Sequence, residues 1–144
     1  MPSRHCAHRG EPPLVIHGFA DAAVAAAALS KVFARGHVAI VADARGMVID
    51  VLAFTDIDHT AEDAIVAGLD AHAADPTACR LVLVSILHDV DISTPNELEV
   101  DGWEKAVDRC RRKGVDLFEW ICCSGEVLRV LSLTAKTQHA WRRG

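Results

Sequence analysis

Three apolar runs constrain the fold more than any other feature of this sequence. They are HVAIVAD at 37–43, MVIDVLAF at 47–54 and RLVLVSIL at 80–87. Each has the length of a strand, and none alternates polar with apolar residues as a strand with one solvated face does. Strands of this kind need apolar cover on both faces. We therefore expect an α/β (α+β) fold, in which a mixed β-sheet is flanked by helices.

Three helix-like segments can supply that cover. The first, 21–34, is rich in strong helix formers, has an acid in its first turn and is followed by a glycine. The second starts at Thr60, an N-cap residue with Asp63 three positions further on, which is the spacing of a capping box. The third covers about 97–113 and is expected to stop at Gly114.

Turn signals join the apolar runs into two hairpins. The short ARG segment links 37–43 to 47–54, and Ser124-Gly125-Glu126 links 115–123 to 127–133. The segment LVIHGF at 14–19 is expected to add a short strand. The main elements then follow the order α-β-β-α-β-α-β-β, with no internal repeat.

Composition limits the classes of protein that need consideration. The 144 residues carry a formal charge of −5 and scattered basic residues, so a broad nucleic-acid surface is not expected. No apolar segment is long enough for a membrane span. Five cysteines without a Cys-x-x-Cys spacing indicate reduced thiols and a cytoplasmic location. We expect a flexible leader at 1–13, one domain at 14–133 and a tail at 134–144.

Three segments in this order resemble the RadC-type branch of the JAB/MPN metalloprotease superfamily. They are VADARGMVID at 41–50, STPNELEVDGWEKAVDRCRRKGVDLFEW at 93–120 and EVLRVLSL at 126–133. The resemblance covers about 36–133. It implies a JAB/MPN (cytidine-deaminase-like) architecture and, where the metal motif is intact, zinc-dependent protease or isopeptidase chemistry.

The metal motif of that family is altered in this chain. It consists of a His-x-His pair, a serine eight positions past the second histidine and an aspartate three positions further. With Thr94-Pro95 as the anchor, these positions fall on Ile86, His88, Asn96 and Glu99. A downstream Asp-His pair of the RadC version falls on Glu119 and Trp120, and the glutamate used as general base falls near Arg35 or Gly36.

These substitutions remove the parts that zinc hydrolysis needs. A catalytic zinc is normally held by three protein ligands and activates a water in the fourth position. Ile86 has no lone pair, so His88 and Glu99 leave two ligands, and no acid stands at the general-base position. The resemblance therefore implies a relic of a metal site. We expect a non-catalytic binding or scaffold module without a cofactor, in contact with a protein partner or with a second copy of itself.

Two other functions stay open at this point. A divergent zinc hydrolase could combine His88 and Glu99 with a substitute ligand, namely Asp89, Asp91 or His59. A role as a DNA-repair accessory protein follows from the RadC label, but the acidic charge argues against it. The plainer interpretation of His88, Asp89 and Asp91 is a solvated loop that caps the third helix, and His59 fits a helix-entry loop.

The remaining conspicuous side chains have structural interpretations. Cys122 and Cys123 are expected to be small apolar residues on opposite faces of a strand, and Trp120 a core or interface aromatic. The basic run 109–113 complements the negative end of the third helix and is expected to be a solvated face.

Overall fold

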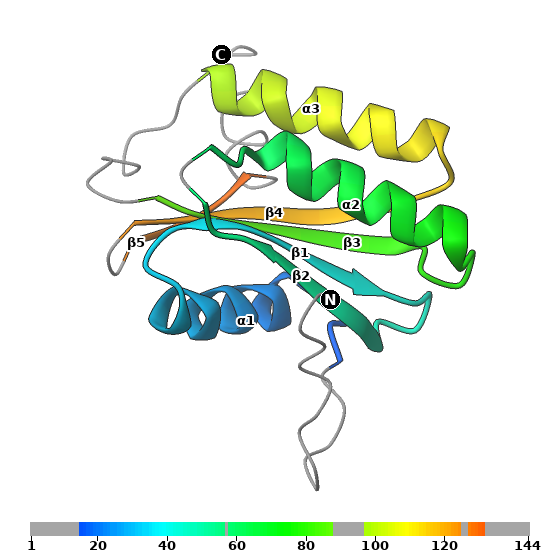
Figure 1. Ribbon diagram of the computed structural model, residues 1–144, viewed down its shortest axis with the longest axis horizontal. Helices are drawn as coiled ribbons and strands as arrows, with labels where there is room; N and C mark the ends of the chain where they lie inside the picture. The colour runs from blue at the N-terminus through cyan, green and yellow to red at the C-terminus, as the bar shows by residue number, and fades with distance from the viewer. Residues whose placement is uncertain (1–14, 57, 88–96, 125–126, 132–144) are drawn as a thin grey trace, which may run out of the picture.

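A five-stranded mixed sheet lies between three helices in the computed structural model (Figure 1). The structure describes residues 15–56, 58–87, 97–124 and 127–131. The strands are β1 (Gly36–Ala42), β2 (Val48–Phe54), β3 (Arg80–Ile86), β4 (Asp116–Ser124) and β5 (Val127–Val130). The helices are α1 (Phe19–Val32), α2 (Ala61–Ala74) and α3 (Glu97–Arg112). The fold class and the order of elements predicted from the sequence are confirmed.

The sheet has the strand order β2-β1-β3-β4-β5. β3 and β4 are parallel, and every other neighbouring pair is antiparallel. A parallel pair needs a crossover connection, and α3 lies within the segment that joins β3 to β4. Both predicted hairpins are present, as β1–β2 and β4–β5.

Both faces of the sheet are covered, as the apolar runs predict. α1 lies on one face, whereas α2 and α3 lie side by side on the other (Figure 1). Alternate residues of β1 separate accordingly: Val38 and Ile40 join the core beneath α1, and Ala39 and Val41 join the core beneath α2 and α3. All four are at most 1% exposed, so the strand needs apolar side chains at every position.

The second helix begins as its capping signal predicts. Thr60 is the N-cap, and its backbone N–H donates to the Asp63 carboxylate at 2.8 Å. Further along, Gly68 faces the sheet so closely that a Cβ there would lie 2.8 Å from the side chain of Leu81. The helix therefore approaches β3 more closely than a larger residue at position 68 would allow.

The structure corrects two boundaries. The expected strand at 14–19 is wrong: Val15 forms one isolated bridge with Met47, and α1 already begins at Phe19. The last strand ends at Val130, because Leu131 turns into a helical conformation and buries its side chain in a cluster with Cys122. The expected leader at 1–13 and tail at 134–144 lie outside the described residues. Within the described part, no helix combines the length and apolar character needed to cross a membrane.

Candidate functional site

Ile86 and Gly36 are direct neighbours on adjacent strands. They are Cα partners in the antiparallel β1–β3 register. The resemblance assigns Ile86 to a metal-binding histidine and places the general base near Arg35 or Gly36. The structure thus brings together two positions that lie far apart in the sequence and that a metal hydrolase would need side by side.

The side chain of Ile86 is part of the apolar core. It is 5% exposed and lies in the cluster beneath α1, together with Val84 and Cys123. Val84 offers only packing contacts, and the Cys123 thiol donates to the Ala26 carbonyl at 3.9 Å. Burial raises the pKa of Cys123 to about 11, so this thiol is not a thiolate that could bind a cation near neutral pH. Position 86 is therefore a core position. An imidazole there would be removed from water without a compensating hydrogen bond, which is unfavourable.

The backbone at Gly36 leaves no room for a side chain. Its φ angle is 132°, a conformation that residues with a Cβ rarely adopt. A Cβ at this position would lie 2.6 Å from the carbonyl oxygen of Phe54 and 3.0 Å from the Cα of Thr55. A glutamate cannot stand here unless the connection after β2 moves. Arg35, the other candidate for the general-base position, is exposed.

The other positions of the metal motif are covered in part. His88, Asp89, Asp91 and Asn96 lie outside the described residues. Glu99 lies in the first turn of α3. Across residues 15–56, 58–87, 97–124 and 127–131, no three His, Cys, Asp or Glu side chains are grouped so that they could hold a metal ion.

His59 lies in the loop that enters α2, as its plainer interpretation predicts. Its Nδ1 atom accepts the backbone N–H of Asp56 at 3.3 Å, and the backbone N–H of His59 donates to the Asp56 carbonyl. The ring stands edge-on to Phe54, with 5.3 Å between the ring centroids. One ring nitrogen of His59 is thus used to hold the loop together.

A partly buried chain of hydrogen bonds links three strands, and sequence reasoning missed it. Trp120 on β4 donates its indole N–H to the Ser85 hydroxyl on β3 at 2.9 Å. Nδ1 of His37 on β1 lies 2.9 Å from the same hydroxyl oxygen. The hydroxyl oxygen has two lone pairs, so it can accept the Trp120 N–H and still either donate its own O–H to Nδ1 of His37 or accept a proton from Nδ1.

The surroundings of His37 favour its neutral form. Burial lowers the pKa of His37 below its usual 6.5, and nearby His59 lowers it further, whereas Asp63 acts in the opposite direction. The relay His37–Ser85–Trp120 connects the indole to β1 through the Ser85 hydroxyl.

The lowered pKa of His37 predicts that the protein loses stability in mild acid. Between the folded-state pKa and 6.5, the unfolded chain binds more protons than the folded one, so stability rises with pH. The contribution should be complete above about pH 6.5 and disappear as the pH falls through the lowered pKa. Urea unfolding at several pH values should show this dependence and its loss in His37→Gln. The exposed-site control His17→Gln should retain it.

The two adjacent cysteines behave as predicted. Cys123 is 0% exposed in the core beneath α1, and Cys122 is buried in a separate cluster with Leu131. Burial raises the pKa of Cys123 to about 11, so its thiol stays protonated near neutral pH. Neither position has the exposed thiolate that nucleophilic chemistry requires.

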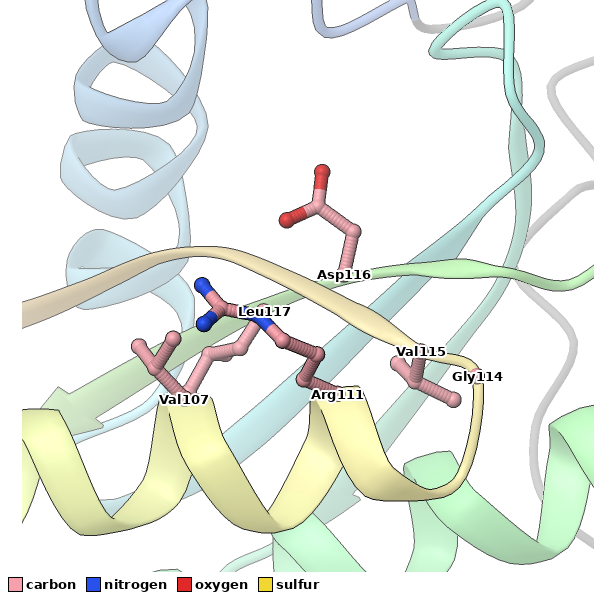
Figure 2. Close-up of a pocket in the computed structure, with 6 residues that line it drawn as sticks. All are labelled: Val107, Arg111, Gly114, Val115, Asp116 and Leu117. Atoms are coloured by element: carbon pink, nitrogen blue, oxygen red, sulfur yellow. The ribbon is translucent and has the colours of Figure 1, made fainter.

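Two hollows lie beside α3. One, of about 300 Å³, lies at its C-terminal end and is lined by Val107, Arg111, Gly114, Val115, Asp116 and Leu117. Figure 2 shows the Arg111 side chain reaching toward β4 and the Asp116 carboxylate pointing away from it. The other, of about 220 Å³, lies between α2 and α3 and has Trp120 in its lining.

The basic run at the end of α3 is partly engaged in ion pairs. Arg109 contacts Glu62 on α2, and Arg112 pairs with Asp108 at 2.7 Å. Arg109, Arg111, Arg112 and Lys113 are all exposed. The expected solvated face is therefore confirmed, and it also joins α3 to α2.

No likeness to a known protein supplements this geometry. No family model, curated protein or solved structure matches the chain. The side chains themselves, above all at the paired positions Gly36 and Ile86, are therefore the guide to function.

Proposed function

We propose that this chain is a non-catalytic JAB/MPN-like domain of the RadC type that acts as a binding or scaffold module. The observation that carries the proposal is the pairing of Ile86 with Gly36. The resemblance assigns position 86 to a metal-binding histidine and places the general base at or beside position 36. In this chain the first side chain is aliphatic, and the second position cannot accept a side chain.

Both losses act on the same chemical step. Zinc hydrolysis needs a metal that lowers the pKa of bound water and a base that removes the proton as the water attacks. Ile86 cannot donate an electron pair to a metal, and Gly36 cannot accept a proton. What remains is a scaffold of stable strands and helices with surfaces that can bind a protein partner or a second copy.

The cysteines support a cytoplasmic setting for this module. Among the described residues, none of Cys79, Cys110, Cys122 and Cys123 forms a disulfide. Cys110 and Cys123 are fully buried and serve as core residues. Free thiols in this number are typical of proteins from a reducing compartment.

Metal analysis tests the proposal directly. We expect protein purified without chelator to contain substoichiometric zinc, because the motif retains at most two of the three ligands that a catalytic site requires. Elemental mass spectrometry of the wild type, His88→Ala and Glu99→Ala should give the same low metal content for all three.

Stoichiometric zinc that disappears in Glu99→Ala would overturn the proposal and support the divergent hydrolase. In that case Asp89→Ala, Asp91→Ala and His59→Ala would identify the substitute ligand. Zinc that is equally abundant in all variants would indicate adventitious binding elsewhere, for example at the histidines of residues 1–13, and would leave the proposal standing.

A further inference from the structure

A groove separates the N-terminal half of α2 from the middle and C-terminal half of α3. α2 and α3 run side by side over the same face of the sheet (Figure 1). The groove has a volume of about 220 Å³ and is lined by Ala61, Glu62, Ile65, Gly102, Lys105, Ala106, Arg109 and Trp120. Since Trp120 belongs to β4, its indole forms the floor between the two helices.

Small residues keep this groove open. Ala61 on α2 and Gly102 and Ala106 on α3 line it, where larger side chains would interdigitate and fill the space. A Cβ built at Gly102 meets nothing within 4 Å. The helix therefore does not need glycine at this position to fit against a neighbour. Glycine at this position adds no side chain to the lining of the groove.

The floor of the groove is held in a fixed orientation. The indole N–H of Trp120 donates to Ser85, which in turn contacts His37. This anchoring restricts ring rotation before any ligand arrives. A bound group therefore meets a preorganised aromatic surface and orders fewer side chains, which favours affinity. Tryptophan in such a setting is also the residue type most often found at the energetic centre of interfaces.

The charged residues that line the groove determine which group can lie next to an inserted side chain. Arg109 spans the groove to reach Glu62, so those two charges largely neutralise each other. Lys105 is exposed and forms no ion pair with any residue in the described part of the chain. Within the described part of the chain, the groove thus presents one cation, Lys105, that pairs with no carboxylate, beside the Trp120 floor.

The volume of the groove favours a single side chain over a small-molecule metabolite as its occupant. Pockets that enclose small molecules usually have volumes of about 300–1,000 Å³. The groove, at about 220 Å³, is smaller than these. It matches one large apolar side chain, whose remaining backbone and neighbours would stay on the open rim.

We propose that this groove receives one large apolar side chain from an acidic peptide segment of a partner protein. Trp120 forms the floor of the site, and Lys105 pairs with a carboxylate next to the inserted side chain. The inference rests on the proposed function, since it specifies where and how the module binds. It identifies the partner by chemistry: an aromatic or aliphatic residue followed by aspartate or glutamate.

Nuclear magnetic resonance of the full ¹⁵N-labelled chain tests this site with defined peptides. The probe is the blocked peptide Gly-Phe-Asp-Asp-Gly, compared with Gly-Phe-Asn-Asn-Gly and Gly-Ala-Asp-Asp-Gly. We expect saturable shifts of the Trp120 indole N–H and the Gly102 and Lys105 amides with the first peptide. The other two should bind about tenfold more weakly, since about 1.4 kcal/mol of contact energy corresponds to that factor.

Three variants separate the site from a general effect. Gly102→Leu places a side chain in the groove and should weaken binding at least about tenfold, without lowering the melting temperature, because leucine is a better helix former than glycine. Lys105→Gln should abolish the preference for Asp over Asn. Lys113→Gln removes the same charge from an exposed position beyond α3 and should change nothing.

The proposal is overturned if the first peptide gives no saturable shifts, if the shifts map elsewhere, or if Gly102→Leu binds as well as the wild type. Each of these results leaves the metal analysis untouched, so the proposed function would stand without this site. Conversely, stoichiometric zinc at Glu99 would reject the proposed function even if the peptide bound in the groove.

Discussion

Replacing Ile86 with histidine is expected to lower the free energy of unfolding by about 3–5 kcal/mol. The substitution restores the residue that the metal motif calls for, yet it does so inside the core beneath α1, where Ile86 is 5% exposed. The protein would lose the packing of an aliphatic side chain and gain an imidazole without water. Urea unfolding monitored by circular dichroism measures the difference. Zinc should not rescue the variant.

Two controls show whether burial is the cause. Ile86→Val keeps the apolar character of the site and should cost about 1 kcal/mol. Ile49→His introduces the same imidazole at an isoleucine that is 39% exposed and should cost less than the change at 86. A fully stable Ile86→His protein that binds zinc stoichiometrically would contradict both the core assignment and the loss of the metal site.

Replacing Gly36 with glutamate is expected to lower the free energy of unfolding by about 2–4 kcal/mol. The cost comes from the backbone, because φ is 132° and the new Cβ would lie 2.6 Å from the Phe54 carbonyl oxygen. Restoring a general base at this position therefore distorts the start of β1 and the chain after β2. Thermal and urea unfolding both measure the loss.

The neighbouring residue provides the matched control. Arg35→Glu introduces the same carboxylate one position earlier, at an exposed side chain, and should change stability by no more than about 0.5 kcal/mol. Gly36→Ala should already show most of the loss, since its Cβ meets the same atoms. If Gly36→Glu were as stable as Arg35→Glu, the backbone at position 36 would be free to adjust. The predicted clash with Phe54 and Thr55 would then be wrong.

Periodicity predicts most of this fold because the strands are apolar on both faces. Runs such as 80–87 cannot be stable on a solvated sheet, so helices on both sides follow from the strands themselves. At the expected strand 14–19 the structure has one isolated bridge, between Val15 and Met47, and α1 begins at Phe19. The early end of β5 has a tertiary cause, namely the burial of Leu131 beside Cys122. Local propensity cannot foresee such a contact.

The candidate sites are less accessible to sequence reasoning. The altered motif at Ile86 can be located from the resemblance, but its pairing with Gly36 depends on strand register. The relay could not be predicted either, because His37, Ser85 and Trp120 come from three strands and meet only through the strand register. Ser85 gave one possible signal, because it is the single polar residue of β3 after Arg80. The groove could not be predicted from the sequence, because its lining residues come from α2, α3 and β4 and meet only in the folded chain.

The position of β3 in the sheet has a consequence for the order of folding. β3 pairs with β1 and β4, and neither is joined to it by a hairpin turn. The hairpins β1–β2 and β4–β5 can form in microseconds. Pairing of β3 with its neighbours must close much longer loops: Arg80 and its partner Asp116 on β4 are 36 residues apart in the sequence. Docking of this central strand should therefore be the slow event that makes folding cooperative. Substitutions in β3 would then slow folding, and changes in the outer hairpins would mainly speed unfolding.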